Sequence, residues 1–402
     1  MKRFKRLIII TTMCLVMILI FSNVSFNKLL SLPNDIYVDY KEIESANEER
    51  LFGKFIKLDM KNEELNTDNT DQQNGEVVFK LFGLIPIKKV SVKILPEEEV
   101  YVGGTPIGLD IKTDGVVVVS DSVVDPISAR VIKNKFIQTG DIIKQINGQK
   151  IGCVNDLTGF LQCVGQDSAE LVVRRNNRDL TLNVPLLKSD NNSYKLGIWI
   201  KDDCAGIGTL TFVKADTHDY GALGHGVTNG SDENLVPMQN GEIFSCRLVN
   251  IQKGEKNKPG ELQCVFVERN KKGSISKNTN VGIFGHLDCV DDLVDTNKTA
   301  PLGGRLSVKA GPAKIISCVS GISEEYDIEI IKTNYQNSNS DKSFVFRVKD
   351  ERLLKLTGGI VQGMSGSPIM QNGKIIGAVT HVFINDATKG YGVYTDWMLE
   401  NL

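Results

Sequence analysis

Residues Gly358 to Met370 read GGIVQGMSGSPIM, a glycine-rich loop that runs into an apolar stretch. A serine can attack an amide only when its hydroxyl is accessible and N–H donors face the oxyanion that develops. Glycines around Ser365 allow the tight backbone that such a loop needs. The stretch therefore predicts Ser365 as a nucleophile, with the backbone amides of Gly363 and Ser365 as its oxyanion hole. The alternatives are a plain turn between two strands, or Ser367 as the reactive hydroxyl.

A serine nucleophile needs a base, and the chain contains four histidines. His225 lies in the sequence YGALGHG, where small neighbours leave room for an imidazole that faces a cleft. We therefore predict His225 as the general base. His286, which also follows a glycine, is the second choice. His218 is surrounded by polar residues and is expected in solvent, whereas His381 follows Ser365 on the next strand and is expected to face the core or a pocket wall.

The third member of a catalytic set orients the histidine and stabilises its charged form. Asp350 follows a predicted strand over 344–349 and precedes Ser365 by a short interval. Asp288 and Asp203 are competitors. Spacing alone does not choose among the three carboxylates.

From residue 195 to the end, short apolar runs alternate with glycine and asparagine turns. Clear examples are 207–213, 262–268, 326–331 and 374–382. Only 351–355 and 395–399 favour helix. This pattern predicts a mainly β peptidase domain over 195–402, built as a β-barrel or as a chymotrypsin-like double barrel.

Residues 100–190 form a separate unit that contains GDIIKQING at 140–148. Its order of short strands and helices, with this G-D-x-I-x-x-I-N-G core, resembles an α/β PDZ domain. In that family a loop presents amide groups to a peptide carboxylate, and the peptide then extends the sheet. The resemblance implies a peptide-binding loop at Gly104, Gly108 and Leu109. Alternatively, Gly108 merely permits a tight turn.

Four basic residues within the first six positions precede the apolar run LIIITTMCLVMILIF at 7–21. This order predicts a transmembrane signal-anchor over 1–26, with the remainder of the chain on the extracytoplasmic side. A cleaved signal peptide is the competing interpretation. Residues 27–75 are predicted to be a flexible juxtamembrane linker, because 61–75 is almost entirely polar. Residues 76–99 are predicted to form a β-hairpin segment.

The composition narrows the possible functions. Lysine plus arginine number 47 against 49 for aspartate plus glutamate, so a net charge of -2 gives no reason to expect nucleic acid as a partner. The eight cysteines form no C-x-x-C pair, and no histidine lies at metal-ligand spacing from one. We therefore expect no metal and no cofactor. Seven of the cysteines follow the apolar run, an odd number that favours free thiols over a complete disulfide framework.

Three stretches, in a chain that also has a PDZ-like unit, resemble the SpoIVB serine peptidase family. They are YGALGHG at 220–226, KDERLLKLTGGIVQGMSGSPIMQNGKIIGAVTHVFIND at 349–386 and YGVYTDWML at 391–399. The resemblance implies that His225 is the base, Asp350 the orienting acid and Ser365 the nucleophile. It also implies that Thr380 forms a wall of the substrate pocket. Asp350 departs from the chymotrypsin-like arrangement, in which the acid lies much further before the serine.

The resemblance implies a biological setting as well. Members of the family are exported from the forespore of an endospore-forming bacterium into the space between the two spore membranes. There they cleave themselves and a membrane-bound regulator, which allows an intramembrane metalloprotease to mature a late sigma factor. The expected partners are therefore that protein substrate, the chain itself and the membrane. Self-cleavage is expected between Phe26 and Glu76.

Two other functions fit parts of the sequence. A non-catalytic, membrane-tethered PDZ module would bind peptides, but it would need neither the Ser365 loop nor the glycine-flanked His225. A carboxy-terminal processing protease also pairs a PDZ domain with a serine, but it uses a Ser–Lys pair, and no lysine lies within the Ser365 loop. The sequence therefore favours a serine endopeptidase of a sporulation signalling pathway.

Overall fold

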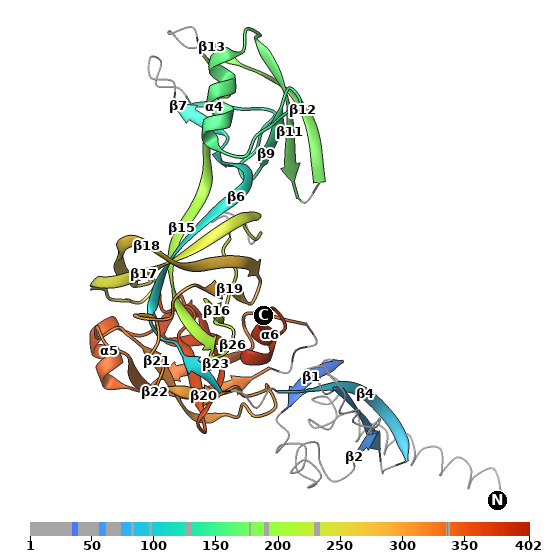
Figure 1. The fold of residues 1–402 in the computed structure, drawn as a ribbon, viewed down its shortest axis with the longest axis vertical. Coiled ribbons are helices and arrows are strands. Elements are labelled where there is room, and N and C mark those ends of the chain that lie inside the picture. The colour runs from blue at the N-terminus through green and yellow to red at the C-terminus, as the bar shows by residue number, and fades with distance from the viewer. Residues whose placement is uncertain are drawn as a thin grey trace, which may run out of the picture.

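The computed structural model contains two β-barrels, a PDZ-like lobe and a small N-terminal sheet (Figure 1). It describes residues 34–38, 56–61, 74–81, 84–95, 99–124, 131–176, 178–188, 193–228, 234–334, 336 and 338–402. Within these ranges strands dominate and the helices are short. The mainly β class predicted from the sequence is therefore confirmed.

The first barrel is closed by a continuous ring of strand pairings. The ring passes from β6 through β17, β18, β19 and β16 to β15, which pairs with β6 again. These strands are β6 (Pro106–Ser120), β15 (Trp199–Lys214), β16 (Asp219–Ala222), β17 (Met238–Gln252), β18 (Glu261–Thr279) and β19 (Gly282–Leu287). β5 (Glu99–Val102) pairs with β15, and β20 (Thr299–Pro301) pairs with β5. Alternate side chains of β6, namely Ile107, Leu109 and Ile111, are buried in the core of this barrel.

The second barrel is closed as well, in the order β21-β22-β23-β26-β25-β24. Its strands are β21 (Gly311–Ser317), β22 (Glu324–Thr333), β23 (Phe344–Val348), β24 (Pro368–Gln371), β25 (Lys374–Phe383) and β26 (Asp386–Tyr394). The short helices α5 (Glu351–Thr357) and α6 (Thr395–Leu399) follow β23 and β26. Phe344, Phe346 and Val348 alternate into the core, as expected for a strand with one buried face. Residues of both barrels line one cavity, so a site can form where the two barrels meet.

The PDZ-like lobe has its own hydrophobic core, which includes Val116, Ile143, Leu157 and Leu171. It is built from the far half of β6 with β7 (Ser122–Val124), β8 (Val131–Lys133), β9 (Ile142–Ile146), β10 (Gln149–Lys150), α4 (Val154–Cys163), β11 (Ser168–Arg175), β12 (Arg178–Pro185), β13 (Leu187–Lys188) and β14 (Tyr194–Lys195). Asn147 and Gly148 both have positive φ, 45° and 79°, between β9 and β10. That is the geometry that an Asn-Gly hairpin turn requires.

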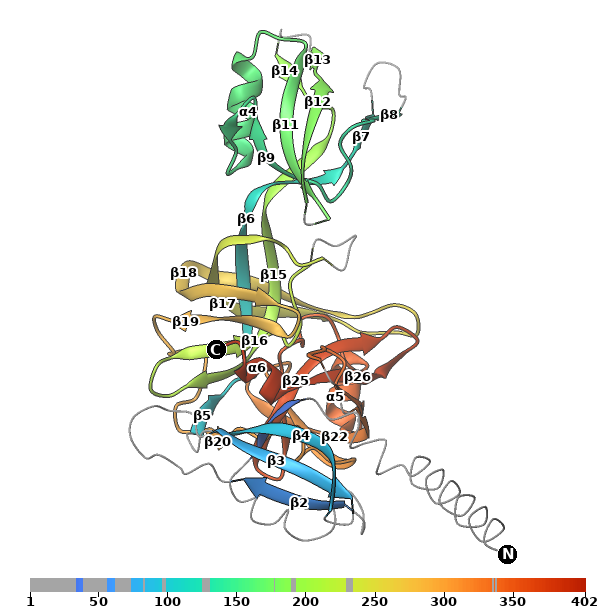
Figure 2. The same cartoon turned by 90° about the vertical axis from the view of Figure 1, so that its right-hand side faces the viewer.

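Two long strands join this lobe to the barrels. β6 and β15 run side by side from the first barrel into the lobe, paired from Pro106–Thr209 to Ser120–Trp199 (Figure 2). The structure therefore differs from the predicted boundaries of 100–190 and 195–402, because 99–112 supplies strands of the first barrel. The PDZ-like lobe is an insertion in that barrel rather than a domain that precedes it.

The predicted peptide-binding loop lies in the barrel, not in the lobe. Gly108 and Leu109 are in the part of β6 that pairs with β15 on one edge and with β17 on the other. The amide of Gly104 donates to the carbonyl of Leu210. A peptide can extend a sheet only along an unpaired edge. The assignment of Gly104, Gly108 and Leu109 to peptide binding is therefore corrected, since pairing on both sides leaves β6 no free edge there.

The N-terminal sheet has the order β1-β4-β3-β2, from β1 (Asp35–Val38), β2 (Ile56–Lys61), β3 (Asn74–Leu81) and β4 (Ile85–Ile94). β3 and β4 are antiparallel neighbours within the region where a hairpin was predicted. β1 and β2 fall within 27–75, so that segment contains strands in addition to linker. The predicted anchor over 1–26 lies outside the described residues. Within the described part of the chain, no helix has the length and apolar character to cross a membrane.

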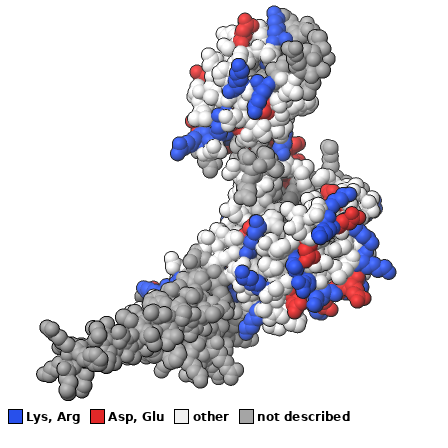
Figure 3. Space-filling view, turned by 180° about the vertical axis from the view of Figure 1, so that it is seen from behind, with Lys and Arg blue, Asp and Glu red and all other residues white. Residues whose placement is uncertain are grey.

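The surface carries both signs of charge. On the face shown in Figure 3, basic and acidic side chains are interspersed over the barrels. Exposed ion pairs of the second barrel include Lys314 with Glu325 and Lys349 with Glu329. Mixed charge of this kind creates no broad single-sign field on that face.

Candidate active site

The Ser365 loop belongs to the second barrel but is held in place by β15 of the first. The backbone amide of Thr209 donates to the carbonyl of Ser365 at 2.8 Å, and the Thr209 hydroxyl donates to the carbonyl of Gly363 at 2.7 Å. The hydroxyl of Thr211 donates to the carbonyl of Gly366 at 2.7 Å. These three bonds tie the loop to the neighbouring barrel and place it at the junction between the two.

Glycine is required at two positions of the loop. Gly363 and Gly366 have φ values of 94° and 97°, in the region that only glycine adopts readily. A Cβ at Gly366 would lie 1.9 Å from the carbonyl oxygen of Thr209. The glycines predicted to shape the loop thus permit both its conformation and its close approach to β15.

The backbone amides of the loop fall into two groups. Those of Met364, Gly366 and Ser367 donate to carbonyls of Val361, Val379 and Met364. The amides of Gly363 and Ser365 have no acceptor among the described residues. Free amides are what an oxyanion hole requires, so the predicted pair is available to a ligand.

The two serines of the loop differ in access. Ser367 is fully buried, and its hydroxyl lies away from solvent. Ser365 is partly exposed and lines a cavity of about 930 Å³. Its hydroxyl donates to the carbonyl of Thr380 at 2.7 Å. Thr380 lines the same cavity, so the structure brings it next to Ser365, the predicted nucleophile.

His225 also lines this cavity, together with Ser365. The chain reaches it from β16 through Leu223 and Gly224, whose φ values are 66° and 69°. Its Nδ1 lies 2.9 Å from the carbonyl of Gly226. Because a carbonyl only accepts, Nδ1 carries the hydrogen, and Nε2 remains an acceptor. Burial lowers the pKa of His225 below its ordinary value, so the ring is neutral at neutral pH.

The structure places Asp350 away from this cavity. Asp350 is the N-cap of α5, and its carboxylate accepts from the amide of Arg352 at 2.9 Å and from the amide of Asp327 at 3.3 Å. Its hydrogen bond with the Arg352 guanidinium holds the pKa of Asp350 below its usual value. Asp350 is therefore not brought to His225, and its role as orienting acid is corrected. An aspartate between a strand and a helix satisfies free helical amides, which accounts for its position.

The other candidate residues lie elsewhere. Asp203 is on β15, 3.6 Å from Lys112. His286 lies on β19, where its Nδ1 is 3.5 Å from Asp219. Neither Asp203 nor His286 lines the cavity that holds Ser365.

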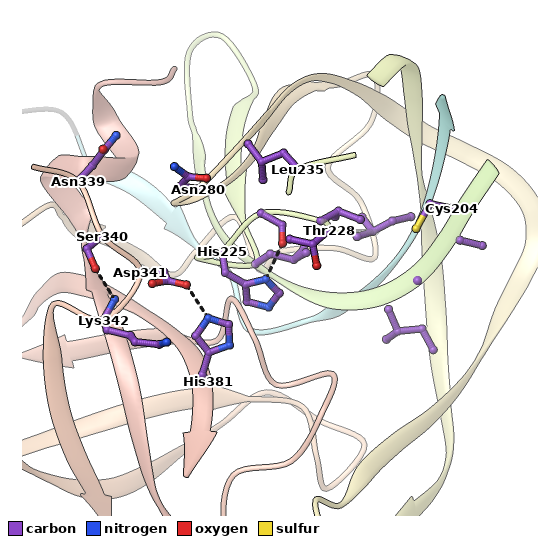
Figure 4. A pocket seen from close by; sticks show the side chains of 17 residues that line it. Cys204, His225, Thr228, Leu235, Asn280, Asn339, Ser340, Asp341, Lys342 and His381 are labelled. Atoms are coloured by element: carbon purple, nitrogen blue, oxygen red, sulfur yellow. Dashed lines mark hydrogen bonds and ion pairs between the residues drawn. The ribbon is translucent and has the colours of Figure 1, made fainter. Parts of the chain in front are cut away.

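Two residues that sequence reasoning did not select stand beside His225. The His381 ring stacks on the His225 ring, with centroids 4.8 Å apart and planes 24° apart. The Nε2 of His381 lies 2.6 Å from Oδ2 of Asp341 (Figure 4). These residues also line a second cavity of about 820 Å³, which shares His225 with the first. His381 was expected to face the core or a pocket wall, whereas Asp341 lies in a polar connection between β22 and β23 that has no distinguishing sequence pattern.

Burial alone would raise the pKa of Asp341, but its hydrogen bond with His381 and nearby positive charge lower it. Asp341 is therefore an ionised carboxylate at neutral pH. No group of three or more potential metal ligands occurs in the described ranges of the chain. The site thus consists of a serine, two histidines, a carboxylate and backbone amides.

The chain has two closed barrels, and the cavity between them is lined by a serine flanked by glycines and by a histidine. This arrangement defines the class of the protein as a serine peptidase. The family model described as SpoIVB peptidase S55 matches residues 192–399, and the chain belongs to this family. The predicted family and the predicted peptidase activity are therefore confirmed.

Two solved structures are similar to parts of the chain. One is the PDZ domain of an SdrC-like protein from Listeria monocytogenes, with 17% identity, covering 22% of this chain and 90% of that one, at a TM-score of 0.18. The other is the Rv3671c protease from M. tuberculosis in its active form, with 11% identity, covering 49% of this chain and 74% of that one, at a TM-score of 0.26. The comparison with curated proteins found no match.

Proposed function

We propose that the chain is a serine endopeptidase in which Ser365 attacks the substrate carbonyl carbon and His225 transfers the proton. The observation that carries this proposal is that both residues line one cavity, with Nε2 of His225 free to accept a proton. The unpaired amides of Gly363 and Ser365 support it, because they lie on the same loop as the hydroxyl.

In the first half of the reaction, the Ser365 hydroxyl exchanges its bond to the Thr380 carbonyl for one to Nε2 of His225. Its oxygen then bonds to the substrate carbonyl carbon while its proton moves to Nε2. The carbonyl oxygen becomes an oxyanion that accepts from the amides of Gly363 and Ser365. His225 next gives the proton to the leaving nitrogen, the C–N bond breaks, and an acyl-enzyme remains.

Water completes the cycle. His225 takes a proton from water as the water oxygen bonds to the acyl carbon, and it returns the proton to Oγ of Ser365 when the ester breaks. The Gly226 carbonyl keeps the hydrogen on Nδ1 throughout, which maintains the tautomer that the first step needs. In this proposal, that carbonyl fills the orienting role that the family resemblance implied for Asp350.

The biological role proposed is that of the SpoIVB family. The chain would be anchored in, or secreted across, a membrane of an endospore-forming bacterium and would act in the forespore intermembrane space. It would cleave itself and a membrane-bound regulator of an intramembrane protease, so that a late sigma factor matures. Family membership and the basic-then-apolar N-terminus support this setting.

Self-processing tests the catalytic proposal. We would express the wild type, Ser365→Ala and Ser367→Ala in membranes and compare their sizes on a gel. Ser365→Ala should remain full length, whereas Ser367→Ala should be processed as the wild type is, because Ser367 is buried. If all three proteins behaved alike, labelling of the purified wild type with a fluorophosphonate would show whether Ser365 is a reactive nucleophile. Absence of label at Ser365 would overturn the proposal.

The position of self-cleavage is a separate test. N-terminal sequencing of the mature protein from sporulating cells should give a first residue between Phe26 and Glu76. An intact Met1 in those cells would contradict self-cleavage as part of the role.

A further inference from the structure

In the described part of the chain, the His381 imidazole stacks on the predicted base and the Asp341 carboxylate binds His381, although neither takes part in the reaction above. We propose that Asp341 and His381 form a positioning pair that holds the His225 ring for proton transfer and sets its affinity for the proton. This inference rests on the proposed function, since it assumes that His225 serves Ser365.

A chain of contacts links the pair to the nucleophile. The Ser365 hydroxyl donates to the carbonyl of Thr380, and the Thr380 hydroxyl donates to the carbonyl of Asp341 at 2.7 Å. The Asp341 carboxylate binds His381, which stacks on His225. Asp341 therefore contacts both partners of the reaction indirectly. Its backbone carbonyl binds Thr380, which accepts from Ser365, and its carboxylate binds His381, which stacks on His225.

The pair also bridges the two barrels. His225 follows β16 of the first barrel, whereas His381 is on β25 and Asp341 precedes β23, both of the second barrel. The base and the nucleophile therefore come from different bodies, and their relative placement depends on contacts across the junction. The His225–His381 stack is such a contact, and the carboxylate keeps the His381 ring in the plane that it needs (Figure 4).

The β25 backbone is shaped for this arrangement. Its register with β26 shifts between Val379 and Val382, so Thr380 and His381 lie on an irregular segment. Irregularities of this type re-aim a side chain and are common near active sites. Here the segment offers the Thr380 carbonyl to Ser365 and the His381 ring to His225.

Stability alone does not account for the pair. The side chains of His381 and Asp341 are 37% and 30% exposed, and ion pairs with that much solvent contact contribute little to folding. Both side chains line cavities beside His225 rather than an outer surface remote from it. Their placement is therefore better explained by an effect on His225.

The charges of the pair act on His225 in opposite directions. His225 loses proton affinity through burial and through its neighbour His381, whereas the Asp341 carboxylate raises the pKa of His225. During attack His225 becomes an imidazolium, which a carboxylate stabilises. The other titratable groups that face the two cavities are Lys342 from the β22–β23 connection, Glu261 from β18, Cys204 from β15 and Tyr391 from β26.

The experiment measures the rate at which a fluorophosphonate labels Ser365 in the full chain between about pH 5 and about pH 9, a range that brackets histidine titration. The variants are Asp341→Asn, Asp341→Glu, His381→Gln and His225→Gln, each checked for folding by circular dichroism. Asp219→Asn is the matched control, because Asp219 pairs with His286 at an exposed position and lines neither cavity.

Asp341→Asn and His381→Gln should each lower the plateau rate by about 10- to 100-fold, as expected when a reacting group is mispositioned. The acid limb of the profile should move to lower pH in Asp341→Asn and to higher pH in His381→Gln. Asp341→Glu should recover most of the rate. His225→Gln should abolish labelling, and Asp219→Asn should match the wild type in rate and profile.

Several results would overturn the inference. One is wild-type behaviour of both Asp341→Asn and His381→Gln. Another is loss of rate with an unmoved acid limb and no recovery in Asp341→Glu, which would indicate a structural role only. A third is complete loss of labelling in His381→Gln at every pH, which would make His381 the base. If the wild type itself were not labelled, the proposed function would fail, and this inference with it.

A second measurement does not depend on activity or on a variant of the pair that folds. The chain has only four histidines, so selectively ¹⁵N-labelled imidazole signals can be assigned by single substitution. In Ser365→Ala, titration of His225 should also perturb the imidazole signals of His381, because the two rings stack. His381 signals that stay unchanged while His225 titrates would overturn the coupling.

Discussion

At the residue scale, the site depends on backbone conformations that few residues accept. Leu223 has a positive φ of 66° just before His225, a strained conformation for a branched side chain. Such strain persists only where surrounding contacts maintain it, and it is common at active sites. Here it turns the chain from β16 so that the His225 ring enters the cavity beside Ser365.

The lowered pKa of His225 predicts how stability depends on pH. Because burial lowers the pKa of His225 below 6.5, the unfolded chain binds more protons than the folded chain between the two pKa values. The stability that depends on His225 is therefore fully present above the pKa of this residue in the unfolded chain. It is lost as the pH falls from that pKa towards the lower pKa of the folded chain. In urea titrations, the wild type should lose more unfolding free energy than His225→Gln between about pH 7.5 and about pH 5.5. Equal losses in the two proteins would contradict this prediction.

Gly366 provides a second test at this scale. Gly366→Ala places a Cβ 1.9 Å from the Thr209 carbonyl oxygen, so the loop must move away from β15. We expect loss of fluorophosphonate labelling and a destabilisation of about 1–3 kcal/mol or more. Gly373→Ala is the matched control, because Gly373 also has a positive φ, 77°, but has no atom within 4 Å of the added carbon. Equal labelling of the two variants would argue against a required close approach.

At the scale of elements, α5 shows how a local signal can be mistaken for a catalytic one. Asp350 stands between β23 and α5, and its carboxylate satisfies helical amides and binds Arg352. The helix ends at Gly358, whose φ of 77° is typical of a C-cap. Both ends of this short helix are therefore specified by residues adjacent to it.

Substitution of Asp350 separates the two roles. Asp350→Ala should cost about 0.5–2 kcal/mol in urea unfolding, because a cap is lost, while labelling of Ser365 changes by less than about tenfold. Asp350→Asn keeps a capping side chain and removes the charge, so its stability should lie close to that of the wild type. Loss of labelling in a folded Asp350→Asn protein would restore Asp350 to the catalytic set.

At the scale of the whole molecule, the PDZ-like lobe and the peptidase share two strands. β6 and β15 extend from the lobe to the first barrel, and Thr209 near the end of β15 holds the Ser365 loop. The lobe has a separate core, so it is a distinct body. Its connection nevertheless consists of paired strands rather than a single flexible linker.

This arrangement predicts which fragments fold. Residues 195–402 lack β5 and β6, so the first barrel cannot close and only the second barrel keeps all its strands. The urea transition of this fragment should therefore have a smaller m value than that of residues 99–402. Residues 99–402 retain every strand of both barrels and the lobe, and they should unfold cooperatively. The comparison requires only far-UV circular dichroism. If the m value of 195–402 were as large as two folded barrels require, the predicted boundary would be an independent domain limit after all.

Much of the architecture follows from local pattern. The helix predicted over 351–355 corresponds to α5, and that over 395–399 to α6. The mainly β class follows from short apolar runs between glycine turns. Such features depend on neighbours in sequence, so single-sequence reasoning reaches them.

The sequence by itself determined the Ser365 loop and the glycine-flanked His225 as candidates, because glycine spacing encodes backbone conformation locally. It also pointed to the family, through motifs within single stretches. Only the tertiary structure decided that β6 lies in the first barrel and that Asp341 and His381 stand beside His225. The physical reason is that strand partners and the contacts among residues 225, 341 and 381 depend on how segments distant in sequence pack together. The sequence of a single segment has no periodic pattern that specifies which distant segment packs against it.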